Sequence, residues 1–230
     1  MEQILILCDD WWHPAEVIER GICGLGKNEY QFDVVKAAKD ILTWDFIEQF
    51  QAIICCKGNN VTAANQQPWF EDGVHEIGPE DFFKYIESGH GFIAVHSACT
   101  FSEHSCKRQE EKFLNPCRKF QMLIGNHFIG HPARCNINVW VSDPLHPVAQ
   151  GIDSFTVHDE HYQITDLAPD AKPFLYSTSE SGGTQIAGYT RELGKGRMSV
   201  ITLGHTVAVW EHPAFRKLIM NSLKWCLQKK

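Results

Sequence analysis

The chain has 230 residues, 43% of them hydrophobic, which is the composition of a globular protein with a well-filled core. Its 28 acidic residues outnumber its 21 Lys and Arg, so the formal net charge is −7, and no run of basic residues occurs. Because a field of this sign repels phosphate backbones, we do not expect nucleic acid as a partner.

The cellular location can be predicted from sequence features that are missing and from the cysteines. No apolar stretch approaches the roughly 18 residues that would span a bilayer, and the start "MEQILILCDD" lacks the basic region and cleavage site of a signal peptide. The nine cysteines are odd in number, form no C-x-x-C pair and lie partly inside apolar runs, as Cys8, Cys55 and Cys56 do. We therefore expect free thiols, a cytoplasmic protein and no membrane partner.

The first part of the chain alternates short apolar runs with helical segments. Strands are predicted at 3–8, 31–37, 51–56 and 91–95, and helices at 13–20, at 43–50 and from 78 onward. Strand runs that are apolar on both faces and separated by helices indicate a parallel sheet covered on both sides.

From about residue 135 the pattern changes. Segments 135–143 and 153–165 alternate like half-exposed strands, 184–204 predicts a hairpin with its turn at 194–196, and 212–229 predicts an amphipathic helix. The predicted fold class is α/β, with a doubly wound, mostly parallel sheet and a late antiparallel elaboration, in a single domain covering 1–230.

Polar side chains follow several of the predicted strands. Asp10 and His13 come after the first strand, Asn59 after the third, His96 after the fourth, and His205 after the strand at 197–203, with Trp210 close behind. Ligands bind at the carboxyl ends of the strands in an open parallel sheet, so we expect these residues to share one site.

The stretch "GFIAVHSACT" (91–100) offers three reactive side chains, His96, Ser97 and Cys99. A sharp turn from strand to helix requires small residues two positions before and after the exposed one. Ala94 and Ala98 meet this requirement for His96, whereas Val95 crowds a turn centred on Ser97. His96 is therefore predicted at the turn.

Two further clusters could contribute. "HDEHY" (158–162) combines Asp159, Glu160 and Tyr162 with two histidines, and a Glu beside a His is the usual material of acid–base catalysis. If this segment is one strand, Glu160 and Tyr162 face the same side as His158. His127 and His131 have the i, i+4 spacing of a helical metal pair, but Gly130 and Pro132 favour a loop.

The sequence resembles the ThuA-like (trehalose utilisation) family. The matching segments are "GFIAVHSA", "GNHFIGHP", "DPLHPVAQGIDSFTVHDEHYQI" and "QIAGYTRELGKGRMSVITLGHTVAVWEHPAFRKLIMNSLKWC", which together cover most of the chain from about 89 to 227. The resemblance implies the class I glutamine amidotransferase-like fold, a flavodoxin-like sheet. In the amidotransferases the turn carries a Cys, and here it carries His96, so glutamine hydrolysis is not expected.

The resemblance also implies sugar catabolism, commonly alongside sugar oxidoreductases that produce keto-sugars. We therefore expect an enzyme acting on a sugar or keto-sugar derivative by acid–base chemistry. The predicted catalytic residues are His96, Glu160, Asp159 and His205, and the predicted substrate-binding residues are Asp10, His13, Asn59, His131, Tyr162 and Trp210. A divalent metal such as Zn²⁺ could assist, with His96, His205 and His158 as candidate ligands.

The sequence is compatible with two other functions. One is a non-catalytic sugar-binding or accessory subunit of a sugar dehydrogenase, and the other is an amidohydrolase that uses Cys99. The expected partners are a small-molecule sugar, a sugar oxidoreductase and a second copy of the chain in a homo-oligomer.

Overall fold

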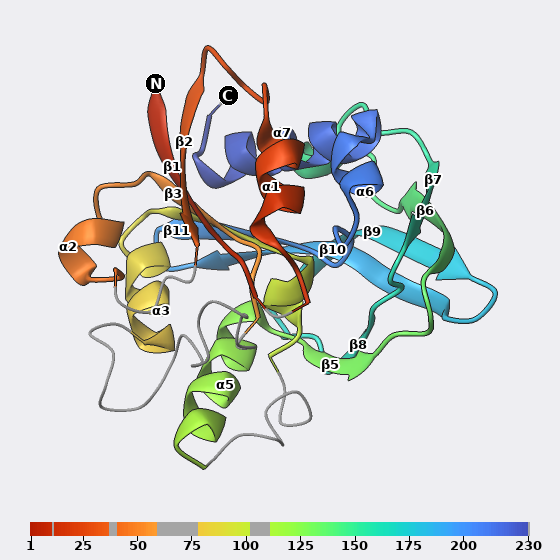
Figure 1. The fold of residues 1–230 in the computed structure, drawn as a ribbon, viewed down its shortest axis with the longest axis horizontal. Coiled ribbons are helices and arrows are strands. Elements are labelled where there is room, and N and C mark those ends of the chain that lie inside the picture. Colours follow the sequence, from red (N-terminus) through yellow and green to blue (C-terminus); the bar gives the residue numbers. More distant parts are fainter. Residues whose placement is uncertain (11, 37–40, 59–77, 102–110, 230) are drawn as a thin grey trace.

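The computed structural model describes residues 1–10, 12–36, 41–58, 78–101 and 111–229 (Figure 1). Within these residues, nine strands form one sheet in the order β2-β1-β3-β4-β11-β10-β9-β6-β7, and β5 and β8 form a small second sheet. The strands are β1 (Glu2–Cys8), β2 (Tyr30–Lys36), β3 (Ala52–Cys55), β4 (Gly91–Val95), β5 (His127–Gly130), β6 (Cys135–Val141), β7 (Phe155–Asp159), β8 (Gln163–Thr165), β9 (Lys172–Ser179), β10 (Gly183–Leu193) and β11 (Gly196–Ile201).

The large sheet has a parallel part and an antiparallel part. Strands β2, β1, β3, β4 and β11 are parallel neighbours. From β11 the sheet continues through β10, β9, β6 and β7 by antiparallel pairing. The result is a mixed α/β fold with a large, mostly parallel sheet, and its antiparallel extension has four strands.

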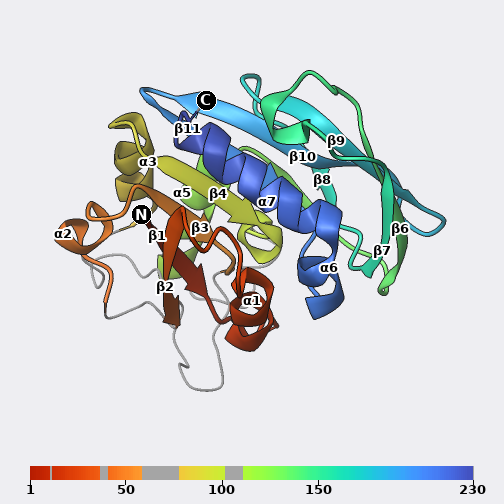
Figure 2. The ribbon, with the colours of Figure 1, turned by 90° about the horizontal axis from the view of Figure 1, so that it is seen from above.

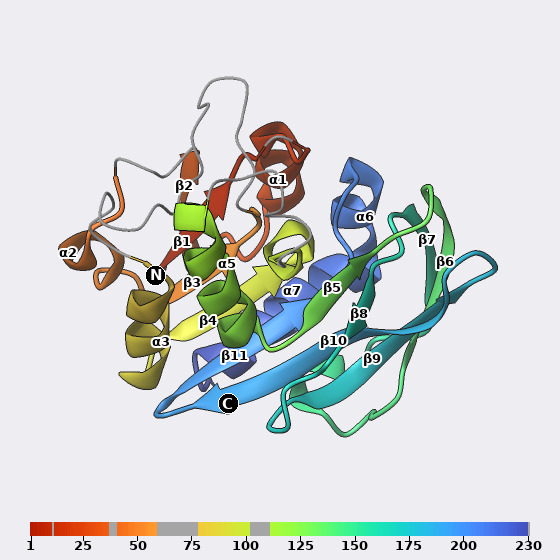
Figure 3. The same ribbon diagram turned by 90° about the horizontal axis from the view of Figure 1, so that it is seen from below.

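Helices cover both faces of the parallel part. They are α1 (Ala15–Ile22), α2 (Trp44–Ile47), α3 (Pro79–Glu87), α5 (Glu111–Ile124), α6 (Val207–Glu211) and α7 (Pro213–Cys226), with 3-10 turns η2 (His96–Cys99) and η3 (Pro147–Ala149). Figure 2 shows α1, α6 and α7 over one face, and Figure 3 shows α3 and α5 over the other.

The alternation of side chains along β1 explains the two cores. Ile4 and Ile6 belong to the core beneath α1 and α7, while Leu5 and Leu7 belong to the core against α2, α3 and α5. Successive side chains of a strand point to opposite faces, so a strand covered on both sides must be apolar throughout. All four of these side chains are fully buried.

The second part of the chain follows its predicted pattern. β7 alternates buried and exposed residues, and β10 and β11 form the hairpin, with Gly194 at φ +58° in the turn. The C-terminal helix α7 buries the predicted face, which includes Phe215, Leu218 and Ile219.

Most of the described cysteines are free, as expected. These are Cys8, Cys23, Cys55, Cys56, Cys99, Cys135 and Cys226. Cys117 is disulfide-bonded, so the expectation of free thiols is wrong for this residue. Among the described residues, no helix has the length and apolarity needed to cross a membrane.

Candidate functional site

Four side chains converge beyond the carboxyl ends of the strands. His13, His96, Glu160 and His205 each offer one nitrogen or oxygen, and these atoms all lie within 4.8 Å of one another. The three histidines follow β1, β4 and β11 of the parallel part, and Glu160 follows β7 of the antiparallel part. We call these four residues the His/Glu cluster.

His96 lies at the predicted turn. β4 ends at Val95, and His96 has a φ of +49°, a left-handed conformation that non-glycine residues rarely adopt. Its Nδ1 lies 2.9 Å from the Thr202 backbone oxygen, which can only accept, so Nδ1 carries the proton. The ring stacks on Tyr162 at 4.1 Å between centroids. His96 is therefore buried, oriented and directed into the cluster through Nε2.

Asp10 orients His13. The Asp10 Oδ1 lies 2.7 Å from His13 Nδ1, and the same carboxylate accepts hydrogen bonds from the backbone N–H groups of Trp12, His13 and Gly58. Burial by itself would raise the pKa of Asp10, but His13 and these N–H donors outweigh it, so the pKa lies below its usual value. Asp10 is thus an ionised acceptor for His13.

Glu160 is the carboxylate of the cluster. One oxygen, Oε2, lies 3.1 Å from His205 Nδ1, 3.4 Å from His96 Nε2 and 3.5 Å from His131 Nε2. Burial favours a raised pKa, but the His205 and His96 imidazoles beside the carboxylate hold the pKa of Glu160 well below its usual range. Burial lowers the pKa of His96, although the nearby Glu160 carboxylate acts in the opposite direction. The site therefore combines an ionised carboxylate with a neutral imidazole.

Asp159 positions the cluster from outside it. Its buried carboxylate accepts hydrogen bonds from the backbone N–H of Gly204 at 2.8 Å and of His205 at 3.1 Å. This fixes the loop after β11 and places the His205 ring.

The strand prediction for 158–162 is wrong at its centre. β7 ends at Asp159 and β8 begins only at Gln163, so His158 and Glu160 do not share a strand face. His158 is exposed, and its Nδ1 lies 3.1 Å from the side chain of Asn136. The structure does not bring it to the cluster.

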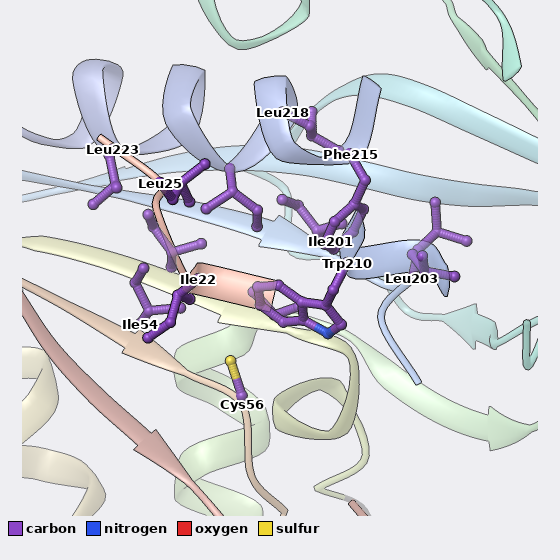
Figure 4. Close-up of a cluster of buried hydrophobic side chains, with 14 of the residues drawn as sticks. Ile22, Leu25, Ile54, Cys56, Ile201, Leu203, Trp210, Phe215, Leu218 and Leu223 are labelled. Atoms are coloured by element: carbon purple, nitrogen blue, oxygen red, sulfur yellow. The ribbon is translucent and has the colours of Figure 1, made fainter. Parts of the chain in front are cut away.

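Of the remaining predicted pocket residues, two lie beside the cluster and one is buried in the core. Tyr162 and His131 lie beside the cluster, with rings stacked at 5.5 Å and the His131 side chain 34% exposed. Trp210 is buried in the α1/α7 core beside Phe215 (Figure 4) and donates a 2.8 Å hydrogen bond to the Gly204 oxygen, so it supports the loop and does not line a pocket. Asn59 lies outside the described residues.

Neither alternative nucleophile points to the cluster. Ser97 donates its hydroxyl to the Cys56 oxygen at 2.8 Å, and Cys99 is 1% exposed within the opposite core. Burial raises the pKa of the Cys99 thiol, which disfavours the reactive thiolate. His127 also stays apart, because it lies on β5 and not on a helix, and its ring bonds to Gln121.

The position of His13 inside the His/Glu cluster was not predicted from the sequence, which gave it only a substrate-binding role. The available signal was the spacing Asp10-x-x-His13 directly after a buried strand. This spacing lets a carboxylate hold the imidazole of the same loop, as the structure has it.

Comparisons with known proteins place the chain in a defined group. A family model described as ThuA, trehalose utilisation, matches residues 4–226. No curated protein sequence matches.

Solved structures share the fold at low identity. A ThuA-like protein from Bacteroides uniformis is 16% identical with a TM-score of 0.68, and the match covers 98% of this chain and 91% of that one. One from Parabacteroides merdae is 15% identical with a TM-score of 0.71, covering 99% and 91%. A cytoplasmic protein from Salmonella typhimurium is 14% identical with a TM-score of 0.66, covering 98% and 99%.

Proposed function

Because the chain belongs to the ThuA (trehalose utilisation) family, we propose that it is a cytoplasmic enzyme of sugar metabolism that acts on a sugar or keto-sugar derivative. The observation that supports an enzyme is the convergence of His13, His96, Glu160 and His205 at one edge of the sheet. An ionised carboxylate in contact with imidazoles has the composition of an acid–base pair.

The proposed chemistry suits a keto-sugar. The C–H bond beside a carbonyl is acidic, so Glu160 takes that proton while an imidazolium protonates the carbonyl oxygen. His205 and His131 are the candidates for this acid, because both contact Glu160 and both are partly exposed. The proposal has two forms, one with side chains alone and one assisted by a divalent ion such as Zn²⁺.

We also propose that the chain forms one doubly wound domain and that the protein is cytoplasmic. A doubly wound, flavodoxin-like domain spanning 1–230 is supported by the parallel order β2-β1-β3-β4-β11 and by helices on both faces. The Salmonella protein of similar fold is described as cytoplasmic, which supports the same location here. A sugar oxidoreductase is the class of enzyme that would supply a keto-sugar, and a homo-oligomer remains part of the proposal.

The test incubates the purified protein with trehalose, simple glycosides and their 3-keto forms. NMR measures the conversion of each sugar. We expect turnover of at least one keto form, reduced about 100-fold or more in E160Q, since a positioned acid or base contributes 10²–10⁴-fold. H90Q is the matched control, because His90 lies at the amino end of β4, opposite the cluster, and bonds to Ser88.

Two results would contradict the proposal. Wild-type turnover by E160Q would remove Glu160 from the chemistry. Saturable sugar binding without any turnover would favour the accessory-subunit function instead.

A further inference from the structure

We infer that His13, His96, His205 and Glu160 together bind one divalent transition-metal ion, for which Zn²⁺ is the first candidate. Asp10 and the Thr202 carbonyl act as positioning groups for two of the imidazoles. The inference deepens the proposed function, because it concerns the same site. It selects the metal-assisted form of the reaction, in which His205 is a ligand and His131 remains the candidate acid.

The hydrogen bonds outside the cluster preset two imidazoles as ligands. His13 Nδ1 faces the Asp10 carboxylate at 2.7 Å, and His96 Nδ1 faces the Thr202 carbonyl at 2.9 Å. Both partners only accept, so the proton of each neutral ring lies on Nδ1 and the lone pair on Nε2. An imidazole held by a carboxylate or backbone carbonyl in this way is the usual outer-shell arrangement of a metal-binding histidine.

His13 provides an independent sign of a missing partner. Its Nε2 is buried and has no hydrogen-bond partner. The His13 side chain is only 9% exposed, so bulk water does not replace that partner. Buried polar nitrogens are rarely left unpaired. The His13 ring lies 4.9 Å from that of His96 and 5.0 Å from that of His205, between centroids, so this nitrogen belongs to the cluster.

The spacing of the other ligand atoms suits a shared ion. His96 Nε2 lies 3.4 Å from both His205 Nδ1 and Glu160 Oε2, and the latter two are 3.1 Å apart. A tetrahedron with bonds of about 2.1 Å has edges of about 3.4 Å. These three atoms therefore already form approximately one face of a coordination shell.

Hydrogen bonds among the four residues alone do not account for this arrangement. With their protons on Nδ1, His13 and His96 present lone pairs to one another and to the Glu160 carboxylate. Protonating both rings would place adjacent cations in a buried site, at high desolvation cost. A single dication satisfies all four groups at once.

The donor set selects the class of ion. Mg²⁺ and Ca²⁺ prefer oxygen ligands, whereas imidazoles suit Zn²⁺ and its first-row neighbours. The Glu160 and His205 side chains are 14% and 17% exposed, so the cluster opens to solvent on their side. Water or a sugar oxygen can reach the ion there.

The test is Zn²⁺ binding to full-length protein stripped with a chelator, measured by calorimetry and by thermal unfolding. We expect one tight site with Zn²⁺, a raised Tm, and no comparable site with Mg²⁺. E160Q and H205Q should each weaken Zn²⁺ binding about 100-fold or more, and H90Q should bind as wild type does. Because Glu160 and His205 are partly exposed, we expect both variants to fold. Circular dichroism checks this.

D10N tests the positioning role separately. Loss of an outer-shell partner typically weakens metal affinity 10–100-fold, so D10N should lie between wild type and E160Q. The Co²⁺-loaded protein should show d–d bands of nitrogen and oxygen coordination.

Three outcomes would overturn the inference: wild-type Zn²⁺ affinity in both E160Q and H205Q, no binding at all, or thiolate charge-transfer bands with Co²⁺. Tight Zn²⁺ binding without turnover of any sugar would contradict only the proposed function. Turnover that persists in fully stripped protein unable to bind Zn²⁺ would contradict only the metal inference.

Discussion

His96 combines an uncommon backbone conformation with a fixed ring. Its φ is positive, and Thr202 and Tyr162 hold the imidazole. Residues kept in sparsely populated conformations concentrate at functional sites, where the surrounding structure stabilises them. The backbone geometry and the chemistry of this residue can therefore be separated by mutation.

Two substitutions at His96 make the separation. Asn tolerates a left-handed φ, so H96N should lose activity about 100-fold or more, with the smaller loss of stability. A β-branched Val is strained there by an additional ~1–2 kcal/mol, so H96V should unfold at lower urea than H96N. Turnover and urea denaturation check this, and equal stability of the two variants would mean that the turn carries no strain.

For single residues, the sequence predicts the position of a side chain well where local steric constraints determine it. Ala94 and Ala98 allowed His96 to be chosen over Ser97 and Cys99. The prediction is poor where the position of a side chain depends on where a strand ends. β7 ends at Asp159, which separates His158 from Glu160, and no local signal marks that end. The ring tautomer of His96 depends on Thr202, which is distant in sequence, and cannot be predicted from spacing.

Among the elements, the loop between β11 and α6 is the one that most directly shapes the site. Asp159 holds it through the backbone of Gly204 and His205, and Trp210 holds it through the Gly204 carbonyl. Trp210 also packs against α1, where it leaves no room for a side chain at Gly21. A buried core residue thus contributes to the position of His205.

W210F tests this support. Phe keeps an aromatic ring but leaves the Gly204 carbonyl without its donor, which should cost about 1–3 kcal/mol of unfolding free energy. Zn²⁺ affinity and turnover should fall, but less than in E160Q, because His205 shifts and is not removed. Chemical denaturation and calorimetry measure both effects. Unchanged stability would show that this hydrogen bond contributes little.

The order of elements was largely predictable, and their pairing was not. Apolar runs separated by helices predicted the parallel strands, because only strands buried on both faces need such sequences. Alternation predicted β6 and β7 as half-exposed strands but not their neighbours in the sheet. The pairing of β5 with β8 joins distant segments that have no distinctive pattern.

The stability of the whole molecule should depend on pH partly through His146. Its Nδ1 accepts a hydrogen bond from the Val148 N–H at the start of η3, and its Nε2 lies 2.9 Å from the Thr190 hydroxyl of β10. Nδ1 can accept only while it is unprotonated. Burial lowers the pKa of His146, with Asp143 opposing. The folded protein thus binds this proton less readily than the unfolded chain.

The stability from neutral His146 is fully present above the unfolded pKa of about 6.5 and is lost as the pH falls below it. H146N retains a side-chain acceptor for the cap but does not titrate, so its unfolding free energy should fall less between pH 7.5 and 5.5. Urea denaturation at both pH values measures this. A decrease equal to that of wild type would remove His146 as a cause.

The distribution of the cluster along the chain has a consequence for synthesis. His13 and His96 emerge from the ribosome well before Glu160, and His205 emerges only after β11. A nascent chain therefore holds at most an incomplete set of ligands until every strand of the described sheet has been made. On the inference that the cluster binds an ion, loading follows the synthesis of His205, and the metal supply available from that stage on sets the active fraction.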